Sequence, residues 1–250
     1  MVALTRCGLT RPHTPEGDPD AQVHLCSGMR PPPEGWTRPD LAARTRFFDE
    51  QVLGAVSAGV RQVVVLGAGY DDRALRFRSP GVRFFELDHP ATQADKSARL
   101  RTLQRPGEPL VLAPVDFRHD DVGVVLAAAG HDSGSSSLFI CEGLLVYLDR
   151  PTIRRLLAAL HLSAAAGSTL TASLATHRAG VDSELVAATA NLRRATATAE
   201  PWRTILPRDE HLALVTEGGW QIENAIDAAG LDPDVEAGRS LFVTAHPAPA

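Results

Sequence analysis

Three acidic residues each follow a short, largely apolar run in the middle of the chain. They are Asp88 after residues 83–87, Asp116 after residues 110–115, and Glu142 after residues 138–141. Runs rich in apolar, β-branched and aromatic residues are typical of buried strands. Parallel strands end at one edge of an open α/β sheet, where ligands bind, so we expect these carboxylates to serve one ligand. The repetition favours a single adenosyl cofactor site.

A glycine turn follows the apolar run VVVL at residues 63–66: Gly67 and Gly69 come at once, and Asp71 and Asp72 follow them. A strand that enters a Gly-x-Gly turn and then a helix presents backbone N–H groups to a nucleotide-like ligand. A dinucleotide motif needs a third glycine, but Asp72 occupies that position. The two carboxylates also disfavour a pyrophosphate at the helix N-terminus, whereas a cationic sulfonium ligand tolerates them. The turn therefore favours S-adenosylmethionine over NAD, and a tight turn without a ligand is the alternative.

Two of the carboxylates have specific expected partners on an adenosyl group. Asp88 lies about 20 residues beyond Gly69, the spacing at which an acidic residue meets a ribose, and it can accept from both ribose hydroxyls. Asp116 is followed by Phe117, so the carboxylate could accept from the adenine amine while the ring packs on the base. An alternative fits the sequence equally well, in which Asp120 or Asp121 caps the next helix and Phe117 belongs to the core.

Composition limits the class of protein. The 250 residues carry a formal charge of −5, with 44% hydrophobic and 22% charged residues, which is ordinary for one globular α/β domain. This charge gives no electrostatic reason to expect a nucleic acid partner, and no apolar run is long enough for a membrane span. The three cysteines lack metal-ligand spacing, so we expect no metal site and a cytoplasmic protein with reduced thiols.

The elements that position these residues follow from periodicity, caps and breakers. Residues 1–39 are proline-rich and predict an irregular arm that contains one short helical turn and either covers a site or is disordered. Residues 40–250 predict a single domain with a lid insertion at about 176–207, which includes a helix over 181–194 and a second segment over 202–206. Predicted strands span 63–66, 83–87, 110–115, 138–141, 168–174 and 240–246. Predicted helices span 41–59, 90–100, 122–129, 151–162, 209–217 and 223–229.

Five segments together resemble the leucine carboxyl methyltransferase family, especially its bacterial branch of S-adenosylmethionine-dependent O-methyltransferases linked to polyketide and other secondary metabolism. The matching segments are ARTRFFD at 43–49, VVLGAGYD at 64–71, FELDHP at 85–90, VDFR at 115–118 and EGLLVYL at 142–148. They occur in the family's order and cover roughly residues 40–175. The family commonly has Thr where this chain has Asp72, a departure that bears on the hydrogen bonding of the turn.

The resemblance implies a class I methyltransferase fold, a seven-stranded, mostly parallel Rossmann-like sheet with an antiparallel last strand and helices on both faces. It also implies a set of site residues. Arg44 would hold the methionine carboxylate, Gly67, Ala68, Gly69 and Leu87 would line the cofactor, Asp88 would take the ribose, Asp116 and Phe117 the adenine, and Glu142 and Tyr147 would lie near the ammonium and the methyl-transfer centre.

The expected reaction is transfer of a methyl group from S-adenosylmethionine to a carboxylate or hydroxyl of a small molecule, with S-adenosylhomocysteine as the product. A carboxylate acceptor needs no strong base, because it is ionised at pH 7, whereas a hydroxyl could use His89, His119 or His177. The alternatives are a protein C-terminal carboxyl methyltransferase and a non-catalytic scaffold that binds the cofactor. A homodimer is compatible with the sequence.

Overall fold

The computed structural model describes residues 2–31, 40–101, 110–177, 201–233 and 240–249. The strands are β1 (Gln62–Leu66), β2 (Arg83–Asp88), β3 (Leu110–Pro114), β4 (Ser137–Cys141), β5 (Thr169–Ala175), β6 (Trp220–Asp227) and β7 (Ser240–Pro247). The helices are α1 (Val2–Arg6), α2 (Ala21–Leu25), α3 (Leu41–Ser57), α4 (Arg73–Arg76), α5 (Pro90–Leu100), α6 (Val122–Ala128), α7 (Arg150–Leu162), α9 (Arg208–Glu217) and α10 (Ala228–Leu231), with a short 3-10 helix, η1, at Leu145–Tyr147.

The described strands form one sheet in the order β3-β2-β1-β4-β5-β7-β6. β1 pairs in parallel with β2 and β4, and the parallel pairing continues to β3 on one side and β5 on the other. β7 runs antiparallel to both of its neighbours. The predicted fold class, a mostly parallel seven-stranded sheet with an antiparallel last strand, is therefore confirmed.

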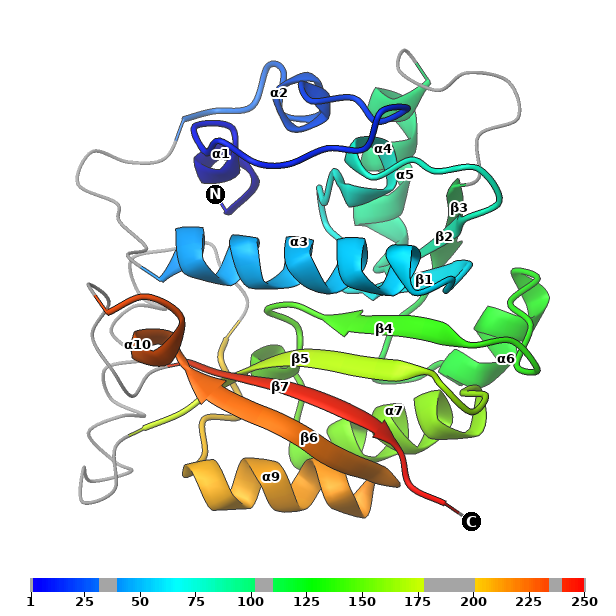
Figure 1. The fold of residues 1–250 in the computed structure, drawn as a ribbon, viewed down its shortest axis with the longest axis vertical. Helices are drawn as coiled ribbons and strands as arrows, with labels where there is room; N and C mark the ends of the chain where they lie inside the picture. Colours follow the sequence, from blue (N-terminus) through cyan, green and yellow to red (C-terminus); the bar gives the residue numbers. More distant parts are fainter. Residues whose placement is uncertain (1, 32–39, 102–109, 178–200, 234–239, 250) are drawn as a thin grey trace.

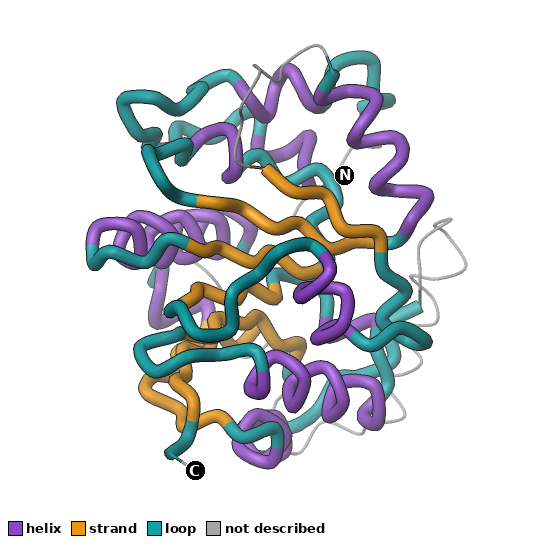
Figure 2. The backbone as a smooth tube through the Cα atoms, turned by 90° about the vertical axis from the view of Figure 1, so that its right-hand side faces the viewer, coloured by secondary structure: helices purple, strands orange, loops and turns teal. Residues whose placement is uncertain are grey.

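Helices cover both faces of the sheet (Figures 1 and 2). The position of β1 between the two helical layers accounts for its uninterrupted apolar sequence at 63–66. Val64 and Leu66 pack into the core on the side of α6, α7 and α9. Val63 and Val65 pack into the core on the side of α3 and α4. A strand buried on both faces reads as a continuous apolar run rather than an alternating one. This central position places the glycine turn that follows β1 in the middle of the sheet's edge.

The N-terminal arm contains two short helices, α1 and α2, rather than the single helical turn expected from its proline content. In Figure 1 both helices lie above α3, and α2 lies on the side of α4 and α5. Leu25 and Ala21 of α2 are fully buried and pack with Leu75 and Leu100 in a small third core. The arm is therefore an integral part of the packed structure, at the end of the sheet where the glycine turn lies.

Most predicted elements are present, and one is wrong. Of the predicted helix over 223–229, residues 223–227 belong to strand β6, and only residues 228 and 229 are helical, in the short α10. β6 is an edge strand with a register shift between Ile222 and Asn224, so its apolar residues do not alternate strictly and a helical period fits them as well. The predicted helix over 181–194 lies outside the described residues. Among the described residues, no helix has the length and hydropathy needed to span a membrane.

Candidate functional site

The glycine turn after β1 has a backbone that only glycine adopts easily. Gly67 and Gly69 have positive φ angles of 66° and 50°, a region that L side chains rarely occupy. A Cβ on Gly67 would also lie 3.0 Å from the side chain of Leu144. The amides of Gly67 and Ala68 both donate to the carbonyl of Leu87, at 2.8 and 3.2 Å. The turn is thus fastened to the end of β2, and the Cβ position of Gly69 opens onto free space among the described residues.

Asp88 at the end of β2 lies directly against this turn. One carboxylate oxygen accepts from the Gly69 amide at 2.6 Å, and the other accepts from the amide of His89, also at 2.6 Å. A carboxylate oxygen has two acceptor positions, so each oxygen retains one for a ligand hydroxyl. The side chain predicted to take a ribose is therefore held in a fixed orientation beside the turn.

Glu142 at the end of β4 is buried and is surrounded by three guanidinium groups. It accepts from Nε of Arg44 at 2.9 Å, from Nη1 of Arg73 at 2.7 Å and from Nη2 of Arg6. Burial by itself would raise the pKa of Glu142, but Arg6, Arg73 and Arg44 together lower it well below its usual range. Glu142 is thus ionised, and the predicted neighbours Arg44 and Glu142 come together as a cation and an anion at one place.

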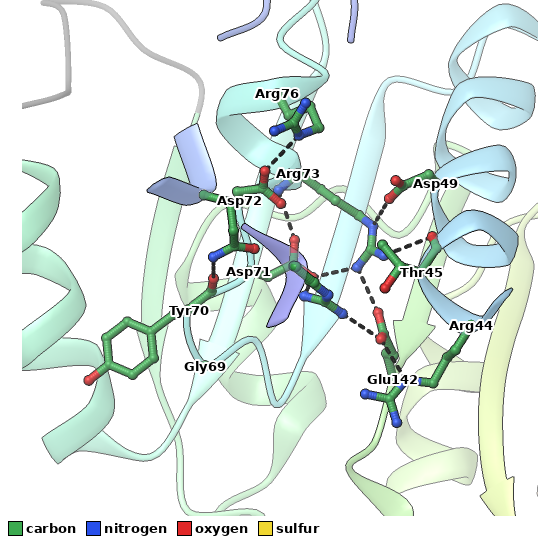
Figure 3. Close-up of polar contacts among 12 residues, drawn as sticks. Arg44, Thr45, Asp49, Gly69, Tyr70, Asp71, Asp72, Arg73, Arg76 and Glu142 are labelled. Carbon is green, nitrogen blue, oxygen red and sulfur yellow. Dashed lines mark hydrogen bonds and ion pairs between the residues drawn. The ribbon is translucent and has the colours of Figure 1, made fainter. Parts of the chain in front are cut away.

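Arg73 is the centre of the charged cluster drawn in Figure 3. Its side chain has no exposed surface, and it binds Asp49 at 2.7 Å, Glu142 at 2.7 Å and Asp71. It also donates to the carbonyl of Thr45 at 3.4 Å. The guanidinium therefore joins α3, the glycine turn and the end of β4, and it keeps three buried carboxylates from repelling one another.

The N-terminal arm contributes two arginines to the site that the sequence did not identify. Arg6 contacts Asp71 at 3.3 Å as well as Glu142, and Arg11 binds Asp49 and Asp72. Nε of Arg6 is buried and has no hydrogen-bond partner among the described residues. One signal in the sequence could have indicated such residues: Asp71 and Asp72 place two adjacent carboxylates after the glycine turn, and carboxylates that become buried need cationic partners.

The remaining predicted residues lie on neighbouring segments of the same edge. Asp116 follows β3 and is 24% exposed. It accepts from Nη2 and Nε of Arg118 at 3.0 and 3.1 Å, which lowers its pKa to about 2. Phe117 is partly buried against the core on the α6 and α7 side. Tyr147 ends η1, five residues beyond Glu142, and is half-buried.

The described end of the lid insertion lies beside η1. The amide of Arg203 donates to the carbonyl of Val146 at 2.7 Å, and the hydroxyl of Thr204 donates to the carbonyl of Leu148 at 2.6 Å. Residues 178–200 lie outside the described part of the chain, so the lid itself stays a prediction. The described portion does bring residues 202–206 next to Tyr147.

A buried ion pair contacts the backbone of the glycine turn. Glu86 of β2 and Lys96 of α5 are both about 1% exposed and form an ion pair, and Nζ of Lys96 also donates to the carbonyl of Asp71 at 2.7 Å. Burial raises the pKa of Glu86 to about 7, even though Lys96 opposes this effect. The pair thus connects the stability of the fold to the backbone of the glycine turn.

This raised pKa predicts a pH-dependent stability. Folded Glu86 binds its proton more tightly than the unfolded chain does, so its contribution to the free energy of unfolding is full below about pH 4.5. The contribution is lost as pH rises towards 7, by up to about 3 kcal/mol. Urea unfolding of wild type and Glu86→Gln at pH 5 and 7.5 measures it. The variant should lack this component, and equal pH slopes for the two proteins would contradict the prediction.

The chain is similar in sequence to known methyltransferases. A model of the leucine carboxyl methyltransferase family matches residues 19–161, more than half of the chain. A protein of Frankia alni, named provisionally as an S-adenosyl-L-methionine-dependent methyltransferase, is 37% identical over 185 residues, which cover 73% of this chain and 62% of the relative. A similarly named protein of Streptomyces avermitilis is 35% identical over 190 residues, covering 74% and 63%. The chain thus spans less than two thirds of the length of these relatives.

The fold itself has solved counterparts. The magnesium protoporphyrin IX methyltransferase of Synechocystis, solved with bound S-adenosylhomocysteine, superposes with a TM-score of 0.56 and 11% identity over 92% of this chain and 93% of its own. At this identity the likeness concerns the fold alone.

Proposed function

The chain belongs to the leucine carboxyl methyltransferase family, and we propose on that basis that it is an S-adenosylmethionine-dependent O-methyltransferase. The observation that carries the proposal is the meeting of Gly67–Gly69, Asp88, Arg44 and Glu142 at the ends of three adjacent strands. This set matches the chemistry of the cofactor: a carboxylate for vicinal hydroxyls, a cation and an anion for an amino-acid zwitterion, and a bare turn between them.

The residues present fit the cofactor. Asp88 would hold the ribose hydroxyls, and Asp116 with Phe117 would hold the adenine. The amino-acid end would take its ammonium to Glu142 and its carboxylate to Arg44. Nε of Arg6, which is buried and has no hydrogen-bond partner in the described part of the chain, offers a further donor for that carboxylate. An unpaired buried N–H costs free energy, so a ligand acceptor at this place would remove a cost that the described residues leave unmet.

The bound cofactor supplies an electrophilic methyl group on a sulfonium centre. The chain's own residues then orient the acceptor and exclude water, which is how a methyl transfer to an ionised carboxylate is accelerated. Tyr147 and the adjoining residues 202–206 lie where they could line the acceptor's side of the site. For a hydroxyl acceptor a base would be needed; His89 instead accepts from the Ala91 amide as the cap of α5, and His119 is 76% exposed.

We propose a small molecule as the acceptor, in secondary metabolism, following the bacterial branch that the sequence resembles. A protein C-terminal carboxylate and a scaffold without catalysis are the alternatives, and a second copy of the chain as a partner stays a prediction. A methyl-release assay with small carboxylic acids, phenols and C-terminal peptides separates the acceptors. Turnover on peptides alone would favour the protein substrate.

Calorimetric titration tests the cofactor assignment directly. S-adenosylhomocysteine should bind the wild-type protein with a Kd of about 1–10 μM, while NADH, as a parallel control, should show no heat of binding. Absence of S-adenosylhomocysteine binding in a folded protein would refute the proposed function. Binding without turnover on any acceptor would favour the scaffold.

A further inference from the structure

We propose that Arg11, held between Asp49 and Asp72, is a positioning residue that keeps Arg6 at the cofactor's amino-acid end and thereby sets the affinity for the cofactor. The inference rests on the proposed function. It concerns how the N-terminal arm is fastened to the glycine turn, and neither the family match nor the sequence motifs assign a role to Arg11.

The contacts of Arg11 form a two-sided clamp. Nε and Nη2 bind the two oxygens of Asp49 in α3 at 2.7 and 2.9 Å, and Nη1 binds Asp72 at 2.7 Å. The side chains of all three residues are at most 3% exposed. Such a bidentate, water-excluded arrangement holds a guanidinium in one orientation. Arg11 therefore fixes the arm to the long helix and to the turn at the same time.

Asp72 is the carboxylate that ties this clamp to the glycine turn. It stands directly before α4 and is fully buried. Burial by itself would raise the pKa of Asp72, but the guanidinium groups of Arg11 and Arg76 lower it below its usual value. An ionised carboxylate at this place needs the arm's cation, whereas a hydroxyl would not. The negative charge of Asp72 and the positive charge of Arg11 thus link the turn to the N-terminal arm.

The arm follows α4 closely beyond the clamp. The amide of Thr14 donates to the carbonyl of Arg76 at 3.2 Å, and the amide of Asp18 donates to the carbonyl of Leu75 at 3.0 Å. A Cβ on Gly17 would lie 1.8 Å from the carbonyl oxygen of Arg76, so the two backbones are in direct contact. Nε2 of Gln22 donates to the carbonyl of Tyr70 inside the turn at 2.9 Å.

Arg6 lies five residues before Arg11, and its guanidinium reaches Asp71 and Glu142. α1 has five residues and no intrinsic stability of its own, since isolated helices this short do not persist in water. Its position therefore depends on the tertiary contacts that flank it, among them the buried Arg11 clamp. Loss of the clamp would release Arg6 from the site without altering any residue that contacts the cofactor.

A double-mutant cycle with Arg6→Met and Arg11→Met tests this, read out as the Kd for S-adenosylhomocysteine. Arg11→Met should weaken binding by about tenfold in the wild-type background and by less than about twofold in the Arg6→Met background, because both changes remove the same interaction. Hydrogen exchange of residues 2–25 should rise in Arg11→Met. Arg154→Met, which removes an exposed ion pair with Glu217, is the matched control and should bind as wild type.

Asp72→Thr provides a second route if Arg11→Met does not fold. It removes the clamp from the turn's side, keeps Asp49 for Arg11, and should weaken binding several-fold, again only when Arg6 is present. Equal effects of Arg11→Met in both backgrounds, or no effect in either, would overturn the inference. A wild-type protein that fails to bind S-adenosylhomocysteine would instead overturn the proposed function, so the two failures are distinguishable.

Discussion

Replacing Arg73 with methionine is expected to lower the free energy of unfolding by about 3–5 kcal/mol. Arg73 is completely buried and is the shared partner of Asp49, Asp71 and Glu142. Asp49 would keep Arg11, Asp71 would keep Arg6, and Glu142 would keep Arg6 and Arg44. Each of the three buried carboxylates would nevertheless lose a hydrogen-bonded cation at the same time, and their mutual repulsion would be less well screened. Methionine preserves much of the apolar stem, so the loss reports the charge rather than the volume.

Denaturant unfolding of matched variants separates the network from buried arginines in general. Arg76 lies in the same helix and is also buried, but among the described residues it pairs with one carboxylate, Asp72, whereas Arg73 pairs with three, so Arg76→Met should cost less than Arg73→Met. Arg154→Met at the surface should stay within about 0.5 kcal/mol of wild type. If Arg73→Met cost no more than Arg76→Met, the central position assigned to Arg73 would be wrong.

The core of the fold could be predicted because its strands are buried on both faces. β1 and β4 are buried throughout and are apolar after their first residues, Gln62 and Ser137, and each is followed by a turn residue or a carboxylate that ends it. The helix after residue 150 begins as the sequence predicts, with Asp149 accepting from the amide of Thr152 and Pro151 in the first turn. Such local signals do not depend on the rest of the chain.

Strand β6 could not be predicted from local sequence signals. Among the described strands only β7 pairs with it, and most of its residues are exposed or partly exposed. Neither face is buried strongly enough to impose a two-residue period, and the register shift at Asn224 interrupts the alternation. The residues 223–229 therefore carried no pattern that distinguished strand from helix, and the pairing partner decided the outcome.

Some residues of the site could be predicted from the sequence, and others could not. Asp88 and Glu142 could be placed because strand ends meet at one edge of the sheet, and Arg44 entered through the family resemblance. Arg6 and Arg11 could not, because they act 136 residues from Glu142 and 38 residues from Asp49 along the chain. A proline-rich composition indicates irregular backbone but contains no information about which carboxylate an arginine will reach.

Asp88→Ala is expected to weaken S-adenosylhomocysteine binding by about 100-fold, or about 3 kcal/mol, because two hydrogen bonds to a charged acceptor are lost. Each carboxylate oxygen already accepts one backbone amide, from Gly69 or His89, so the side chain is oriented before the ligand arrives. Little ordering of Asp88 is needed on binding, and most of the gross interaction should appear in the affinity.

Asp88→Asn is the informative companion to this change. Its amide can still accept at one oxygen, but its NH₂ group would face either the Gly69 amide or the His89 amide, donor against donor. Calorimetry should therefore find that Asp88→Asn binds only slightly better than Asp88→Ala, although Asn is nearly isosteric with Asp.

Asp116→Ala, at the next strand end and partly exposed, removes one expected contact and should weaken binding by about tenfold or less. Thermal unfolding without ligand identifies any variant that is simply less stable. If Asp88→Ala bound within twofold of wild type while Asp116→Ala lost more, the ribose would not be held at the end of β2, and the orientation proposed for the cofactor would have to be reversed.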